Sequence, residues 1–329
     1  MPLTLALLVV LLACGAAPRR PPPARRRATL APTGEPPPAS RTAPPSARRP
    51  PATAPPAPTD APTATPTALP EDVGAPGIGD PYFPQMGNGG YDAQHYHIDI
   101  DVEMEARTID STVTIEAVAE QDLARFNLDF VGLEIGELTV DGQPAGYERE
   151  GGELIITPAE EIAAGEPFTV TVSYSGTPGL GVPQSGAEYS VGWAFHEEGV
   201  YVAGEPGGAS GWYPVNGHPL DKATYSFEIT VDEPWVAAAN GVLLEEIDGG
   251  GERTYVWELD DPAASYLVTV AIGDFVVETS QTASGIPVRN YFPPDLPDET
   301  RDEFDPQPAM IDFFETLFGP YPFDAYGVF

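Results

Sequence analysis

The stretch Val202–Val231 reads VAGEPGGASGWYPVNGHPLDKATYSFEITV and joins a loop to a strand. Its first half, as far as Asp221, has a glycine or proline every few residues, so no helix or strand can run through it. Trp212 and Tyr213 nevertheless lie in this loop, and large aromatic side chains favour burial. From Thr224 onward, apolar and polar residues alternate, which predicts a strand with one buried face. An ordered loop before such a strand is a typical place for a binding site.

The same alternation recurs on both sides of this stretch. Residues 96–104 carry apolar side chains at every second position, and residues 109–115 repeat the pattern after a turn, which predicts a long antiparallel hairpin. Further apolar runs follow as far as Tyr291, separated by turn-forming pairs such as Asp141–Gly142 and Asn240–Gly241. This spacing predicts a mainly β fold, a large two-layered antiparallel β-sandwich.

The pattern changes after Tyr291. Residues 308–318 carry apolar side chains at helical spacing, with Pro308 near the start and Gly319 directly after the end, which predicts an amphipathic helix. The sandwich offers this helix no second helical layer, and the apolar segment Tyr321–Phe329 reads as the opening of a strand. We therefore expect a further α-containing domain, of which this chain holds the first strand and helix.

The formal net charge of −35 is unevenly distributed along the chain. Residues 1–70 hold eight arginines and two acids, whereas residues 71–329 hold 48 acids and seven basic residues. An acidic surface repels nucleic acid and anionic lipid, so we expect no nucleic-acid partner for the folded part. The simplest interpretation of the charge is a solvated acidic surface. Basic or amine-bearing ligands are a second interpretation.

The N-terminus has the features of an export signal. Residues 3–13 form an apolar run that is short for a membrane span but suits the core of a signal peptide. The run continues into LLACG at positions 11–15, which resembles a bacterial lipobox, and Cys14 is the one cysteine of the chain. We expect residues 1–14 to be a signal peptide with a lipobox and the protein to be an extracytoplasmic, membrane-anchored lipoprotein of a bacterium. A secreted protein is the alternative, because no basic residue precedes the run.

Composition divides the rest of the chain into three parts. Residues 15–80 are rich in Pro, Ala and Arg and have little to bury, which predicts a disordered linker. Residues 85–282 contain the predicted sandwich, and residues 283–329 begin the expected second domain.

One cysteine allows no disulfide within the chain. The four histidines contain no His-Glu-x-x-His motif, and His218 is expected to be a hydrogen-bonding turn residue.

Six motifs in order give the chain a family resemblance. They are YDAQHY at 91–96, DLARFNLD at 122–129, EPGGA at 205–209 followed by WYP at 212–214, PLDKATY at 219–225, SYL at 265–267 with IGDF at 272–275, and FETLFGPYPF at 314–323. Together they resemble the N-terminal domain of the M1-type zinc aminopeptidases, aminopeptidase N and its relatives, over residues 91–329. The resemblance implies a saddle-like β domain followed by the start of a zinc metallopeptidase domain.

The resemblance also implies one site residue. In that family the loop matching Val202–Asp221 reaches the active-site cleft, and the residue matching Glu205 binds the free α-amine of a peptide substrate. A carboxylate suits this role because its attraction to an ammonium is strong in a partly desolvated pocket. The match is imperfect, since Ser210 replaces a frequent arginine and Asn216–Pro219 replaces an acidic turn. On composition alone, Glu205 is one surface acid among many.

The zinc ligands of the family lie on a His-Glu-x-x-His helix and a later glutamate. This chain contains neither, so the resemblance implies Zn²⁺ in a full-length protein with ligands absent from this chain. We expect the N-terminal, amine-binding part of a secreted or lipid-anchored aminopeptidase that acts on peptides with a free N-terminus, and no activity from this chain alone. A stand-alone β-rich surface-binding lipoprotein and an inactive homologue are the alternatives.

Overall fold

The computed structural model describes residues 72–179 and 191–329, which belong to one compact unit. The predicted signal peptide, Cys14 and the linker as far as residue 71 lie outside the described residues. Among the residues that the structure describes, no helix combines the length and the hydrophobicity needed to cross a membrane.

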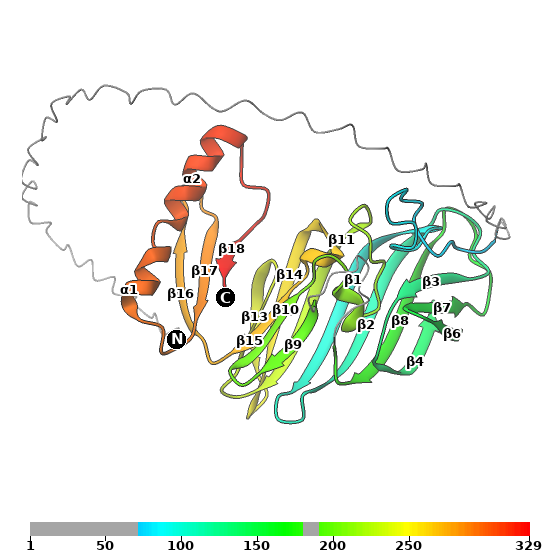
Figure 1. The fold of residues 1–329 in the computed structure, drawn as a ribbon, viewed down its shortest axis with the longest axis horizontal. Coiled ribbons are helices and arrows are strands. Elements are labelled where there is room, and N and C mark those ends of the chain that lie inside the picture. The colour runs from blue at the N-terminus through cyan, green and yellow to red at the C-terminus, as the bar shows by residue number, and fades with distance from the viewer. Residues whose placement is uncertain (1–71, 180–190) are drawn as a thin grey trace, which may run out of the picture. The chain divides into compact units, whose positions relative to one another are not determined.

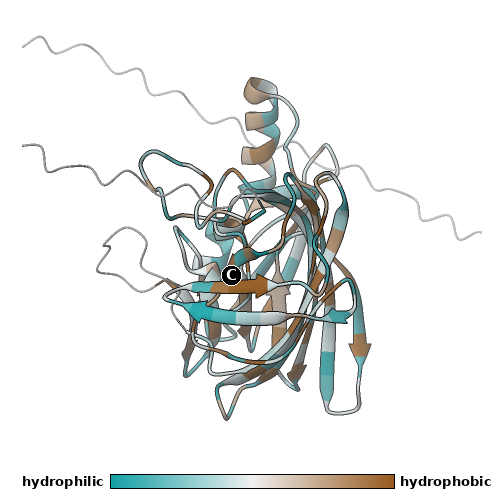
Figure 2. Cartoon of the chain, turned by 90° about the vertical axis from the view of Figure 1, so that its right-hand side faces the viewer, coloured by the Kyte–Doolittle hydropathy of each residue, from teal (hydrophilic) through white to brown (hydrophobic). Residues whose placement is uncertain are grey.

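The largest sheet has eight strands in the order β13-β14-β11-β1-β2-β8-β4-β5 (Figure 1). In chain order these are β1 (Tyr91–Glu103), β2 (Thr108–Ala119), β4 (Glu134–Val140), β5 (Gln143–Pro144), β8 (Pro167–Gly176), β11 (Lys222–Asp232), β13 (Val242–Asp248) and β14 (Glu252–Ala264). In the central strands β1, β2, β8 and β11 the side chains alternate between a buried and a polar face, and in β1 Ile98 and Ile100 are fully buried. Figure 2 shows this alternation as teal and brown bands along the strands.

The predicted hairpin is confirmed by the antiparallel pair β1–β2, in which Ile98 faces Val113. The mainly antiparallel sandwich is also confirmed, but β1 pairs with β11 in parallel, with Tyr96 beside Tyr225. More than a hundred residues separate these two strands, so their connection need not be a hairpin and a parallel pair is possible. The rings of Tyr96 and Tyr225 stack with their centroids 5.1 Å apart at the centre of the sheet.

Two smaller sheets supply the second layer. One has the order β3-β7-β6, from β3 (Phe126–Asp129), β7 (Glu153–Thr157) and β6 (Gly146–Glu150). The other has the order β12-β15-β10-β9, from β12 (Val236–Ala239), β15 (Val270–Gly273), β10 (Gly199–Ala203) and β9 (Gly192–His196). Their buried side chains join those of the large sheet in one hydrophobic core.

The last part of the chain forms a third small sheet and two helices. The sheet has the order β16-β17-β18, from β16 (Val276–Gln281), β17 (Pro287–Phe292) and β18 (Tyr326–Val328). Helix α1 (Asp298–Arg301) precedes α2 (Gln307–Phe318), which confirms the predicted amphipathic helix. Ile311 of α2 is buried, and the Gln307 Oε1 atom accepts a hydrogen bond from Asn290 Nδ2 at 2.9 Å. Most of its large apolar side chains are exposed: Met310, Phe313, Phe314, Leu317 and Phe318.

Candidate functional site

The loop between β10 and β11 is held in the core by aromatic side chains. Trp212 and Tyr213 are fully buried, which explains why large aromatics occur in a segment rich in glycine and proline. Their ring centroids lie 4.4 Å apart, and Trp212 also contacts Trp193 at 5.6 Å. Burial of two such side chains stabilises the loop by several kcal/mol, about 1.5–3 kcal/mol for each large apolar side chain. The loop is therefore an ordered part of the fold.

Glu205 lies at the start of this loop, two residues after β10 ends at Ala203. The Gly208 N–H donates a hydrogen bond to the Gly204 carbonyl at 2.7 Å, which closes a tight turn around Glu205 and Pro206. Gly204 packs against Tyr266, and a Cβ atom at this position would lie 2.5 Å from the Tyr266 carbonyl oxygen, so only glycine fits. The side chain of Glu205 is exposed and forms no ion pair with any of the described residues.

The far end of the loop is fixed by the side chain of Asn216, which is buried. Its Oδ1 atom accepts a hydrogen bond from the Asn88 N–H at 2.7 Å, and its Nδ2 atom donates to the Asn88 carbonyl at 2.9 Å. The same Nδ2 atom also donates to Asp221 Oδ2. The turn at Asn216–Pro219, which departs from the family pattern, is thus held by the Asn216 side-chain amide. This amide connects the turn to Asn88 before β1 and to Asp221 before β11.

His218 is a hydrogen-bonding turn residue, as predicted. Its side chain is buried, its Nδ1 atom accepts a hydrogen bond from the Leu220 N–H at 3.1 Å, and its Nε2 atom lies 3.4 Å from Asp80 Oδ2. The described residues contain no group of three or more His, Cys, Asp and Glu side chains placed to hold a metal ion. The residues present therefore do not fit a catalytic zinc, and no step through a metal can be assigned to them.

Three acids near the loop, the buried Asp129 and Asp221 and the partly buried Glu153, were not predicted as site residues. Burial raises the pKa of Asp129 to about 6 and that of Asp221 to about 7. Burial also raises the pKa of Glu153 to about 7, with a further contribution from the charge of Asp129. Asp129 is tied to the loop, because its Oδ2 atom accepts a hydrogen bond from the Gly217 N–H at 2.8 Å. In the sequence, the one feature that could have indicated these acids is the alternation of Asn127 and Asp129 with apolar residues.

The geometry defines what the loop can do chemically. It presents one exposed carboxylate, that of Glu205, ahead of a buried segment that is anchored by Trp212, Tyr213 and Asn216. A positioned, unpaired carboxylate binds cations, and an ammonium group adds directed hydrogen bonds to the electrostatic attraction. The loop is therefore suited to binding an ammonium group.

Comparisons with known proteins agree on one family. Residues 92–267 match the model of the Peptidase M1 N-terminal domain. Aminopeptidase A of Gloydius brevicauda is 27% identical over 237 residues, which cover 68% of this chain and 24% of that protein. Endoplasmic reticulum aminopeptidase 1 of Homo sapiens is 25% identical over 243 residues, which cover 69% of this chain and 26% of that protein.

Solved structures show the same similarity. An M1 zinc metallopeptidase from Deinococcus radiodurans matches with a TM-score of 0.70 and 27% identity, over 76% of this chain and 58% of that one. A mutant of the enzyme from the same organism, bound to a Tyr-Ser-Ala substrate, also matches with a TM-score of 0.70. This chain therefore spans about a quarter of the length of the curated relatives that it matches and just over half of the solved ones.

Proposed function

Because the chain belongs to the M1 peptidase family, as the match of the N-terminal domain over residues 92–267 shows, we propose that it forms the amine-binding part of a zinc aminopeptidase. An aminopeptidase-type function follows from the family. The substrate is a peptide with a free N-terminus, and the residue that recognises it is Glu205. The family does not favour the alternative of a stand-alone surface-binding protein.

The observation that carries this proposal is the position of Glu205. Its side chain is exposed and forms no ion pair with the described residues, and it lies between the buried Gly204 and the buried residues 207–216 of the loop. An enzyme that removes N-terminal residues must distinguish a free α-amine from an amide nitrogen. A carboxylate does so, because it attracts the ammonium and gains nothing from a blocked N-terminus.

Zinc enters the proposal through the relatives, some of which are zinc metallopeptidases. The zinc, when bound by the remainder of a longer protein, would polarise the scissile carbonyl and activate water. This chain would contribute substrate positioning. Its loop would hold the N-terminal ammonium of the peptide and so fix how many residues separate the free end from the bond that is cut.

The test compares two proteins and two substrates. We expect the longer gene product that contains this chain to hydrolyse aminoacyl arylamides in a chelator-sensitive reaction, and to spare the N-acetylated forms. We expect the 329-residue chain alone to show no turnover. Equal hydrolysis of free and N-acetylated substrates would contradict amine recognition. Zinc-dependent turnover by the 329-residue chain would contradict the assignment of catalysis to another part.

We also propose that the protein is exported and anchored to the membrane through a lipid on Cys14. The support is the apolar run of residues 3–13 ahead of the one cysteine in a lipobox-like sequence. In a bacterial host, radiolabelled palmitate should be incorporated into the wild-type protein and not into the Cys14→Ser variant. Labelling that persists in Cys14→Ser, or release of the wild-type protein into the medium, would contradict the anchor.

A further inference from the structure

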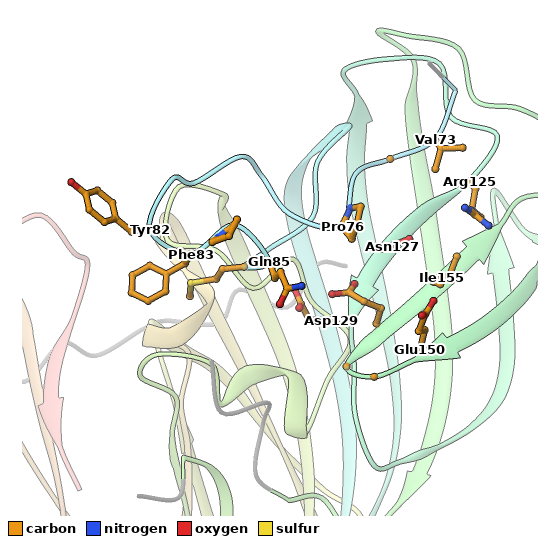
Figure 3. Close-up of a pocket in the computed structure, with 16 residues that line it drawn as sticks. Val73, Pro76, Tyr82, Phe83, Gln85, Arg125, Asn127, Asp129, Glu150 and Ile155 are labelled. Carbon is orange, nitrogen blue, oxygen red and sulfur yellow. The ribbon is translucent and has the colours of Figure 1, made fainter. Parts of the chain in front are cut away.

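A cavity of about 640 Å³ lies between the sheet β3-β7-β6 and the segment of residues 73–86, which we call the strap (Figure 3). Residues of the outer face of the sheet form its floor, and Pro76, Phe83 and Met86 of the strap line the opposite side. A volume of this size is in the range of small-molecule sites, which are typically ~300–1,000 Å³. Glu205 does not line this cavity, although Asp129 of its floor accepts a hydrogen bond from Gly217 of the Glu205 loop.

The strap is held in place by backbone hydrogen bonds. The Gly74 N–H donates to the Arg125 carbonyl at 2.8 Å, which places Val73 beside the start of β3. Gly77 has a φ of +128°, and a Cβ atom there would lie 2.1 Å from the Pro84 carbonyl oxygen. The strap therefore folds back on itself at this point only because residue 77 is glycine. The cavity wall is therefore built into the fold.

The floor of the cavity places two acids opposite each other. In β3, Phe126 and Leu128 belong to the core, so Asn127 and Asp129 face outward to the cavity. The register of β3 with β7 pairs Asp129 directly with Glu153. Like charges in this arrangement destabilise a sheet, and here Asp129 is only 2% exposed.

The polar groups of this pair are incompletely satisfied. Asp129 Oδ2 accepts hydrogen bonds from Asn88 Nδ2 at 3.2 Å and from the Gly217 N–H at 2.8 Å. Glu153 Oε2, in contrast, is buried without a hydrogen-bond partner. A buried acceptor without a donor costs about 1–3 kcal/mol. A ligand that brings donors and positive charge would remove this cost.

We propose that this cavity binds an organic primary amine, with the ammonium between Asp129 and Glu153 and the apolar part of the ligand against Phe83 and Met86. An ammonium has three donors and a charge opposite to that of the pair. The strap supplies the apolar and aromatic surface that a bare metal ion would not need, and the volume far exceeds that of an ion. The ligand class is therefore an amine with an aliphatic or aromatic body.

The site gains its negative charge at about neutral pH. Burial raises the pKa of Asp129 to about 6 and that of Glu153 to about 7. The other titratable groups that line the cavity are Glu150 at the end of β6, where it pairs with Glu153, Arg125 before β3 and Tyr82 on the strap. Amine binding should therefore strengthen as the pH rises from about 5 to about 8, because both carboxyls lose their protons in this range.

The experiment titrates the 329-residue chain with phenethylamine at about pH 8 and follows backbone amide shifts by NMR. Phenethyl alcohol, which has nearly the same shape and no charge, is the matched ligand. We expect the amine to shift resonances of the strap and of β3, and the alcohol to bind at least roughly tenfold more weakly. Glu153→Gln should weaken amine binding by a similar factor. Glu148→Gln, a change at an exposed acid outside the cavity, should leave it unchanged.

Several results would overturn the proposal. These are equal binding of the alcohol, unchanged amine affinity in a folded Glu153→Gln variant, or loss of the strap shifts in Glu205→Gln, which would place the amine on the loop. A Ca²⁺ titration that reproduces the shifts while the amine does not would assign the site to a divalent cation. If Glu153→Gln does not fold, the comparison of amine with alcohol and the Glu205→Gln variant still decide.

Discussion

The hydroxyl of Tyr96, on the central strand β1, accepts a hydrogen bond from the backbone N–H of Asn216 at 3.0 Å. Both residues are buried, and the Tyr96 ring also contacts Tyr213 edge-on with the centroids 5.8 Å apart. The Tyr96 side chain thus holds the candidate loop in two ways, through the backbone of Asn216 and through the ring of Tyr213. The loop depends on such long-range contacts, because its own regular structure is limited to one 3-10 turn at Ala209–Gly211 and an isolated bridge between Val215 and Asp129.

Tyr96→Phe should therefore destabilise the protein. The change keeps the ring but leaves the Asn216 N–H buried without an acceptor, which costs about 1–3 kcal/mol. Urea denaturation followed by tryptophan fluorescence measures the free energy of unfolding. The control is Tyr201→Phe at a half-exposed tyrosine, where we expect a change within roughly 0.5 kcal/mol. Equal stability of the two variants would show that the hydrogen bond contributes nothing.

Glu205→Gln should weaken substrate use by the full-length enzyme. Glutamine keeps the size of the side chain and removes the charge that attracts the ammonium, a loss of about 1.5–3 kcal/mol or roughly 10- to 100-fold in kcat/KM. Steady-state kinetics with a peptide arylamide measure this ratio. Glu197→Gln, an exposed acid on the preceding turn, serves as the control and should leave kcat/KM unchanged. A Glu205→Gln enzyme with normal kcat/KM would remove Glu205 from substrate binding.

Much of the fold could be predicted from the sequence because it depends on local periodicity. The alternation in β1 and β2, the strand after Thr224 and the helix at 307–318 are all set by side chains within a few residues of each other. The parallel pairing of β1 with β11 could not be predicted. It depends on which of many similar strands meet at long range, and alternation is the same for both strand directions.

The candidate site divides along the same line. The role of Glu205 stays a prediction from the family resemblance, whereas the burial of Trp212 and Tyr213 was predictable from their size and is confirmed. The pair Asp129 and Glu153 did not, because the two residues become neighbours only through the register of β3 with β7. The same holds for Asn88 and Asn216, whose side chains meet across more than a hundred residues of sequence. Long-range pairing of polar groups leaves no periodic signal.

The exposed apolar face of α2 should make the 329-residue chain associate. Phe318 is 81% exposed, and four other large apolar side chains of the helix are more than half exposed. Exposed patches of this kind mark interfaces. Sedimentation velocity should show concentration-dependent association that Phe314→Ser with Phe318→Ser reduces. In the longer enzyme, where we propose that the remaining part covers this face, the wild type should stay dispersed. A monomeric 329-residue chain at all concentrations would contradict this expectation.

The stability of the fold should decrease as the pH rises from about 4 to about 7. Asp129, Glu153 and Asp221 have raised pKa values in the folded protein, so folding favours their protonated forms. Their contribution to stability is therefore fully present below their ordinary pKa values and is lost as the pH passes through the folded ones. For Asp129, a pKa raised from 3.8 to about 6 corresponds to roughly 2–3 kcal/mol.

Asp129→Asn separates this effect from the general repulsion of an acidic surface. The amide can still accept the hydrogen bond from the Gly217 N–H, but it carries no charge at any pH. Denaturation at a series of pH values should show a smaller loss of stability between about pH 5 and about pH 7.5 in this variant than in the wild type, with Glu148→Gln behaving like the wild type. Two results would contradict this prediction: a wild-type stability that rises over this pH range, or an equal slope in Asp129→Asn. Either would mean that the Asp129 carboxyl is already charged throughout the range in the folded protein.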